Sequence, residues 1–321
     1  MKEEEVISLS NKCNFNAITA YPLKLEASAR QYWRVTDSSN QSKILCYLDP
    51  NLGDHIDFIN ISNNLKKNDV SCSSVIHHNS ELGITIQDDL GDDDLLSILT
   101  DSNKKHFLQE SLRVLIKVQN TKISPIKFFL IDELKDQMNL FNDIFCEKFL
   151  KISSNQLVKD LILETLSKLN NQPWLNCHYD FERRNLILNK QNVLSIIDFQ
   201  DMRIGPIGID LAGILVDHYY EIDFNLLNDL LQFYKKESES IYTVDELFEF
   251  LRWGSIQRNI RILGTLANLY VKEDRSYRLK DLPMILKNLT RMIPEGNELK
   301  IFLREDCLLY TSPSPRDTNE S

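Results

Sequence analysis

The chain has 321 residues, of which 42% are hydrophobic and 26% are charged, and its formal net charge is −10. This length is enough for two packed lobes or one large domain. Because the charge is acidic and no block of Lys and Arg is present, nonspecific binding to nucleic acid is excluded as an expected function. The charge does not exclude a phosphorylated ligand, since local donors and magnesium can hold one in an acidic protein.

The ends of the chain and its cysteines predict a soluble cytoplasmic protein that does not enter a membrane. Residues 1–6 lack the basic start and apolar run of a signal peptide, and no apolar run reaches the ~20 residues that span a bilayer. The six cysteines are scattered and include no Cys-x-x-Cys pair, which fits reduced thiols better than disulfides or a zinc site. The sequence does not indicate an oligomeric state.

Residues 1–90 are predicted to form a small, β-rich lobe with antiparallel strands. Short apolar and aromatic runs separated by polar turns indicate strands at residues 17–26, 30–36, 43–48, 75–76 and 84–87. Residues 57–67 are predicted to form a helix, because their apolar side chains recur on one helical face. A polar segment at residues 88–94, rich in aspartate, is expected to be a solvated hinge.

Residues 91–306 show helical periodicity and are predicted to form a larger helical lobe. Residues 185–188 and 193–198 interrupt it as a hairpin, and Thr243-x-x-Glu246 is a capping box before a long helix. The last segment, residues 307–321, has no apolar period and is predicted to be a disordered or non-native tail. The element order predicts an α+β, bilobal fold of the protein-kinase type.

Three polar residues around the hairpin carry the predicted chemistry. Asp180 precedes Asn185 by five positions, and Asp198 ends the apolar strand that follows. Phosphoryl transfer needs a group that orients the attacking hydroxyl and oxygen ligands for magnesium. We predict that Asp180 is the catalytic base and that Asn185 and Asp198 bind the metal. Each residue type alone is common in turns and at strand ends, but such local roles do not account for their joint spacing.

The segments 178–185, 198–201 and 205–211 resemble the aminoglycoside phosphotransferase and choline kinase-like superfamily. Residues 198–206, 257–264 and 277–283 are most similar to the bacterial kinases of N-acetylmuramate and N-acetylglucosamine. This resemblance implies an ATP- and Mg2+-dependent kinase that phosphorylates the anomeric hydroxyl of a cell-wall amino sugar, in peptidoglycan recycling. It also implies a mainly structural role for Asp210.

The expected phosphate-binding elements depart from the protein-kinase pattern. The turn at residues 27–33 has no glycine, so Ser28 and backbone amides are expected to cover the phosphates. The third strand has no central lysine, since Lys43 lies too early in it. Arg30 is the candidate for a substitute cation.

The substrate site is predicted from charge and from the resemblance. N-acetylmuramate carries a carboxylate that favours a bidentate arginine, and Arg203, Arg258 and Arg261 are candidates. The resemblance adds Asp201, so that Asp201, Arg203 and Arg258 form the predicted substrate set. Two other functions remain open. One is a kinase for an aminoglycoside, choline or another small alcohol, and the other is a nucleotide-binding pseudokinase scaffold.

Overall fold

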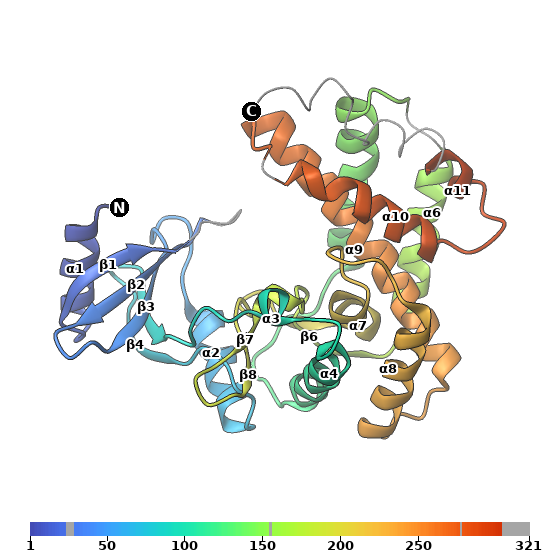
Figure 1. Cartoon of the computed structure of the whole chain (residues 1–321). Coiled ribbons are helices and arrows are strands. Elements are labelled where there is room, and N and C mark those ends of the chain that lie inside the picture. The colour runs from blue at the N-terminus through green and yellow to red at the C-terminus, as the bar shows by residue number, and fades with distance from the viewer. Residues whose placement is uncertain (24–28, 154–155, 277, 304–321) are drawn as a thin grey trace. The chain divides into compact units, whose positions relative to one another are not determined.

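The computed structural model describes residues 1–23, 29–153, 156–276 and 278–303, in which the chain forms two compact units (Figure 1). Unit 1 comprises Met1–Ile126 and Arg183–Met202, and unit 2 comprises Lys127–Glu182 and the chain from Arg203 onward. Ser28, Tyr277 of the sequence motif and the predicted tail lie outside the described residues.

Unit 1 contains the predicted antiparallel sheet. Its strands follow the order β1-β2-β3-β5-β4, and every neighbouring pair is antiparallel. A helix that the sequence analysis did not predict, α1 (Glu3–Lys12), packs against β1, and Figure 1 shows it beside the sheet. Acidic residues in its first turn and Lys12 in its last favour this helix. The strands are β1 (Ala17–Pro22), β2 (Gln31–Asp37), β3 (Ser42–Tyr47), β4 (Val75–Asn79) and β5 (Ile84–Asp88).

The two faces of this sheet have different roles, because successive side chains of a strand point to opposite sides. One face packs with Val6 of α1 into an apolar core that includes Trp33, Val35, Leu45, Ile84 and Ile86. The residues between them in the sequence lie on the other face. There Tyr32 is paired across strands with Cys46, and Arg34 with Ile44. The alternation of the strands thus separates a core from a face that carries polar groups.

The rest of unit 1 attaches the hairpin to this sheet. The backbone N–H of Ser73 donates to the carbonyl of Ile196 at 3.2 Å, and the N–H of Leu188 donates to Asp93 at 2.9 Å. The boundary predicted at residue 90 therefore differs from the division seen here, because such bonds hold the hairpin and residues 91–126 in unit 1. The remaining elements are α2 (Ile56–Lys67), α3 (Leu95–Ile98), α4 (Lys104–Asn120), the short η2 (Arg183–Asn185), β7 (Leu186–Leu188) and β8 (Leu194–Ile196).

Unit 2 is built around one long helix, α9, which has 30 residues. It packs against α5, α6, α7, α8, α10 and the π-helix η1, and Figure 1 shows it crossing its neighbours α7 and α10. The predicted capping box starts it, with Thr243 Oγ1 accepting from the N–H of Glu246 at 3.2 Å. The elements of unit 2 are α5 (Ile131–Leu140), η1 (Phe141–Phe149), α6 (Gln156–Asn170), β6 (Trp174–Cys177), β9 (Arg203–Pro206), α7 (Ile207–Leu215), α8 (Phe224–Glu237), α9 (Val244–Glu273), η3 (Leu279–Asp281), α10 (Leu282–Met292) and α11 (Leu299–Phe302).

Helices α7 and α9 touch through their backbones. A Cβ atom added at Gly254 of α9 would lie 2.0 Å from the carbonyl oxygen of Gly208 of α7. Only residues without a side chain allow this approach. The contact fixes the position of α9 on α7, and both helices carry side chains that hold the loop after β6.

Among the described residues, no helix has both the length and the apolar character needed to cross a membrane.

Candidate functional site

The loop at residues 178–182, which follows β6 in unit 2, is held from one side by α7. The carboxylate of Asp210 accepts from the backbone N–H groups of His178, at 2.6 Å, and Tyr179, at 2.8 Å. Asp210 is buried, with 1% of its surface exposed. Tyr179 has a φ of 76°, in the left-handed region that a bulky residue rarely adopts. Asp210 therefore has the structural role that the resemblance implied, since it stabilises the unusual backbone before Asp180.

Helix α9 holds the same loop through two arginines. Arg261 Nη2 donates to Asp180 Oδ1 at 2.7 Å, and Arg258 Nη1 donates to the same oxygen at 3.3 Å and to the carbonyl of Tyr179 at 3.0 Å. Arg258 Nη2 also donates to Glu182 at 2.8 Å. The arginine side chains are 4% and 16% exposed for Arg258 and Arg261, whereas that of Asp180 is 41% exposed. The carboxylate of Asp180 is thus anchored at one oxygen and still open to solvent.

These contacts decide the charge of Asp180. Burial acts to raise its pKa, but the charges of Arg261, Arg258 and His178 outweigh that effect and hold the pKa well below its usual range. The carboxylate is therefore ionised at neutral pH, which is the form that can take a proton from a hydroxyl.

A column of rings and guanidinium groups supports Tyr179. The guanidinium of Arg261 lies over the Tyr179 ring at 4.3 Å, and the ring of Phe129 lies 4.6 Å from that of Tyr179. Arg203 lies 5.2 Å from the Phe129 ring and donates to Glu133 at 2.6 Å. Cation–π and aromatic contacts of this kind favour one fixed arrangement of the rings. The predicted substrate residues Arg203 and Arg258 are thus both found around Tyr179 in unit 2.

The predicted metal ligands lie in unit 1, where they line one cavity of about 610 Å³. Asn185 and Asp198 are brought together by a backbone bond in which the N–H of Ile197 donates to the carbonyl of Asn185 at 3.0 Å. Asp198 accepts from Gln200 at 2.8 Å, and Gln200 also donates to Asp201 at 3.3 Å. An amide oxygen and a carboxylate in one cavity are hard donors of the kind that magnesium prefers.

The polar face of the sheet lines the same cavity. Arg30, Tyr32, Arg184 and Asp198 are among its lining residues. Burial raises the pKa of the Cys46 thiol to about 12, and the nearby charges of Arg30 and Asp198 act on it in opposite directions. Arg30 therefore brings positive charge to the part of β3 where a protein kinase has its lysine. Lys43, in contrast, pairs with Asp88 at 3.0 Å and does not line this cavity.

The aspartate-rich segment has structural partners, so it is not a purely solvated hinge as we expected. Arg34, which lines the cavity, pairs with Asp89 and with Asp92, in each case at 2.7 Å. Asp94 caps α3 by accepting from the N–H of Ser97 at 2.7 Å. A charged side chain on β2 thereby fixes the segment that follows β5.

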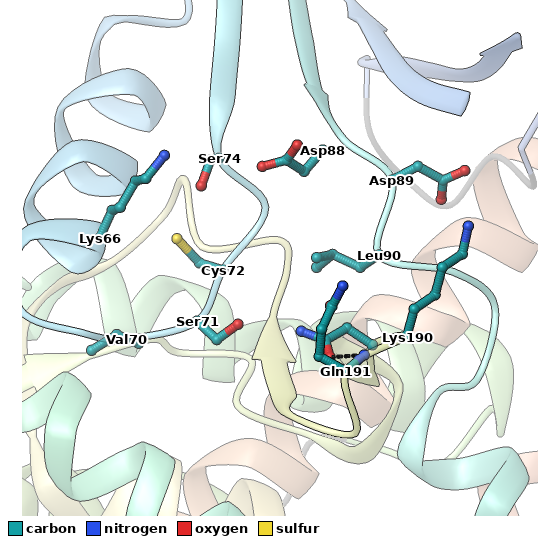
Figure 2. Close-up of a pocket in the computed structure, with 11 residues that line it drawn as sticks. Lys66, Val70, Ser71, Cys72, Ser74, Asp88, Asp89, Leu90, Lys190 and Gln191 are labelled. Atoms are coloured by element: carbon teal, nitrogen blue, oxygen red, sulfur yellow. Dashed lines mark hydrogen bonds between the residues drawn. The ribbon is translucent and has the colours of Figure 1, made fainter. Parts of the chain in front are cut away.

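Unit 1 has a second cavity of about 440 Å³, which Figure 2 shows between Lys66 of α2 and Lys190 of the hairpin turn. It shares the wall formed by Asp88, Asp89 and Leu90 with the larger cavity. None of the described residues that line it belongs to the predicted base, metal or phosphate set. We therefore place the candidate nucleotide site in the larger cavity.

The sequence analysis missed several residues around these sites. Tyr32 and Arg34 could have been found from the period of two in β2, which places them on the face opposite the core. Glu182 carried no such signal, because its partner Arg258 lies 76 positions away. The predicted residue Asp201 belongs to unit 1, whereas Asp180, Arg203 and Arg258 belong to unit 2.

Comparison with known sequences decides the family. The sequence model described as the phosphotransferase enzyme family matches residues 19–246, which is more than half of the chain. The chain belongs to this family. Its phosphotransferase assignment and its kinase-like fold agree with the prediction from Asp180, Asn185 and Asp198.

Relatives within and around the family differ in their substrates. A curated relative, the N-acetylmuramate/N-acetylglucosamine kinase of Neisseria meningitidis serogroup B, is 25% identical over 288 residues, which cover 85% of each chain. The structure of a spectinomycin phosphotransferase with ADP and spectinomycin has a TM-score of 0.61 and 15% identity, with 96% of this chain and 99% of that one covered. The choline kinase of Streptococcus pneumoniae has a TM-score of 0.62 and 15% identity, with 90% and 99% covered. The solved structures thus support the fold.

Proposed function

We propose that this phosphotransferase is an ATP- and Mg2+-dependent kinase of a cell-wall amino sugar, acting on the anomeric hydroxyl of N-acetylmuramate, N-acetylglucosamine or both. Its product would be a sugar 1-phosphate suited to peptidoglycan recycling. The substrate is proposed because a curated N-acetylmuramate/N-acetylglucosamine kinase aligns with this chain over 85% of both chains. The anchored, ionised and solvent-accessible Asp180 supports the reaction type.

In the proposed reaction, Asp180 accepts a hydrogen bond from the anomeric hydroxyl and orients its oxygen toward the γ-phosphorus of ATP. The sugar oxygen forms a bond to that phosphorus while the bond to the β–γ bridging oxygen breaks, and ADP leaves. The hydroxyl proton is released through Asp180 to water. Because the pKa of Asp180 is depressed, the carboxylate acts mainly by orientation and by its charge.

The nucleotide is proposed to bind in the larger cavity of unit 1. Asn185 and Asp198 would hold magnesium, which supplies positive charge to the transferring phosphoryl group when it is bound. Arg30 is the proposed cation for the phosphates in place of the strand lysine, and Ser28 remains a prediction from the sequence. Both metal ligands and Arg30 line this one cavity, which supports the assignment.

The two arginines predicted to bind the sugar differ in how far their side chains are exposed to solvent. The side chain of Arg203 is 30% exposed, whereas that of Arg258 is only 4% exposed and already binds the 178–182 loop. We therefore propose Arg203 as the residue that reads the carboxylate of N-acetylmuramate, while Asp201 remains the predicted contact to sugar hydroxyls.

ADP release with a panel of acceptors tests the function. Wild-type protein with magnesium and ATP should turn over N-acetylmuramate or N-acetylglucosamine, and Asp180→Asn should lose about 10³-fold or more in kcat, since the hydroxyl loses its charged acceptor. Asp136→Asn, an exposed change on α5, is the matched control and should keep full activity.

The same set of acceptors also tests the two alternative functions. Turnover of kanamycin, spectinomycin or choline without turnover of either sugar would replace the sugar with another alcohol. Absence of turnover with every acceptor, together with normal ADP binding, would instead indicate a nucleotide-binding scaffold.

A further inference from the structure

We infer that Arg261 and Arg258 are positioning residues for Asp180, and that they act through Asp180 rather than by binding the sugar. This inference rests on the proposed function, because it assigns a role within the same site. It departs from the sequence prediction, in which these arginines were candidates for the carboxylate of N-acetylmuramate.

Both arginines bind the same oxygen atom of the Asp180 carboxylate. Arg261 Nη2 and Arg258 Nη1 donate to Oδ1 of Asp180, at 2.7 and 3.3 Å. A carboxylate held at a single oxygen by two donors cannot rotate freely, so its remaining surface faces one direction. The 41% exposure of the Asp180 side chain shows that this surface is accessible.

Other groups in unit 2 hold the two arginine side chains in place. Arg258 is held by Glu182 at 2.8 Å and by the carbonyl of Tyr179 at 3.0 Å, and Glu182 accepts from the hydroxyl of Tyr219 at 3.3 Å. The guanidinium of Arg261 lies over the Tyr179 ring, 4.3 Å from its centre. A carboxylate of a substrate that took either guanidinium would have to replace these contacts and those to Asp180. Such replacement is costly for side chains that are 4% and 16% exposed.

Groups of both signs of charge lie around Asp180. The positive groups are Arg258 and Arg261 of α9, and the imidazole of His178 in the same loop also acts to lower the pKa of Asp180. The negative groups nearby are Glu182, which is bound to Arg258, and Asp210 of α7, which is bound to the backbone before Asp180. Loss of Arg261 would therefore remove the closest positive charge from a carboxylate that must stay ionised.

Steady-state kinetics of Arg261→Gln measure the role of this arginine. We expect kcat to fall about 10- to 100-fold, while KM for each sugar and for ATP stays within about 3-fold, as expected for an interaction that acts in the transition state. The acidic limb of the kcat/KM–pH profile should move upward, because Asp180 loses a positive neighbour. Arg261→Lys should recover part of kcat and of the pH shift.

The matched control is Arg252→Gln on the same helix. Arg252 pairs with Glu249 at 2.6 Å and lies 4.9 Å from the ring of Phe248, both on its own helix, so its replacement should leave kcat and the pH profile unchanged. A different outcome for Arg261→Gln would overturn the inference. If KM for N-acetylmuramate alone rose, with kcat and the acidic limb unchanged, Arg261 would be a substrate-reading residue.

A measurement of thermal stability, which does not depend on enzymatic activity, distinguishes the role of Arg261 from the proposed function. A carboxyl group with a depressed pKa stabilises the fold above its unfolded pKa of about 4, and this contribution is lost as the pH falls. The difference in thermal midpoint between wild type and Arg261→Gln should therefore be constant from pH 7 to about pH 4 and narrow as the pH falls below 4 toward the depressed folded pKa, and Asp180→Asn should abolish that narrowing. If the narrowing is seen in a protein that has no kinase activity, the proposed function is wrong, but the contact between Arg261 and Asp180 is still supported. A constant difference at every pH would refute the role in ionisation.

Discussion

At the scale of single residues, the site depends on how a few charged side chains are shared. Asp180, Arg258, Arg261 and Glu182 form one connected set, so the arginines nearest the base have partners within the protein. Arg203 differs, because its pair with Glu133 leaves nearly a third of the side chain exposed. From this distribution we propose that α9 positions Asp180 and that β9 recognises an anionic sugar.

Replacement of Arg203 by alanine tests that assignment. We expect kcat/KM for N-acetylmuramate to fall about 10- to 100-fold, since a hydrogen bond between charged groups contributes about 1.5–3 kcal/mol. N-acetylglucosamine has no carboxylate, so its kcat/KM should change by no more than about 3-fold. Steady-state assays with both sugars measure the difference.

Glu133→Gln is the control for this prediction, because it removes the partner of Arg203 and keeps the arginine. It should preserve the preference between the two sugars. Equal losses for both sugars in Arg203→Ala would show that Arg203 does not read the carboxylate.

At the scale of elements, two helices determine where the 178–182 loop lies. Asp210 of α7 holds the N–H groups of the loop, and Arg258 and Arg261 of α9 hold its carbonyl and carboxylate groups. The backbone contact between Gly208 and Gly254 keeps these two helices close. The position of Asp180 therefore depends on the crossing of these two helices.

Gly254→Ala should destabilise unit 2 although alanine favours helices. The gain in helix propensity is about 1 kcal/mol, but the added Cβ would lie 2.0 Å from the carbonyl oxygen of Gly208. Overpacking at such a contact costs about 1–3 kcal/mol and often more, so we expect a net loss of about 1–3 kcal/mol and a lower kcat. Urea unfolding followed by circular dichroism measures the loss.

Lys272→Ala, an exposed change near the end of α9, is the control for the crossing and should change the stability by less than about 0.5 kcal/mol. If Gly254→Ala were as stable as wild type, the helices would have room to separate, and the crossing would not fix the loop.

At the scale of the whole molecule, the proposed functions divide between the two units. Both metal-ligand candidates and Arg30 line a cavity formed by unit 1, whereas Asp180 and the arginines that hold it belong to unit 2. Nucleotide binding and positioning of the base should therefore respond to different substitutions.

Titration of ADP and magnesium tests this division. Arg30→Ala should weaken ADP binding about 10-fold, as expected when a phosphate loses a charged donor. Arg261→Gln should leave ADP affinity within about 2-fold of wild type, because Arg261 lies outside the unit that contains the cavity. Isothermal titration calorimetry measures both affinities.

Lys66→Ala and Lys190→Ala are the controls, since these lysines line the second cavity of unit 1. Both variants should bind ADP normally. Weaker binding in these variants than in Arg30→Ala would move the nucleotide to the smaller cavity.

The sequence by itself determined the features that depend on local pattern. Short apolar and aromatic runs between polar turns predicted the strands of the sheet, and the Thr243–Glu246 capping box predicted the start of α9. The spacing of Asp180, Asn185 and Asp198 predicted phosphoryl transfer, because few other reactions need these groups in this order. The helix at residues 3–12 was missed because it is short and largely polar, with only Val6 and Ser10 buried.

The tertiary structure alone decided which charges meet. Asp180 and Arg261 are separated by 81 positions, and His178 and Asp210 by 32. No local period links such residues, since their distances depend on the packing of α7 against α9. The sequence therefore predicted Asp180 as the base and the arginines as ligands of the substrate, and only the packing showed that Arg258 and Arg261 bind the carboxylate of Asp180.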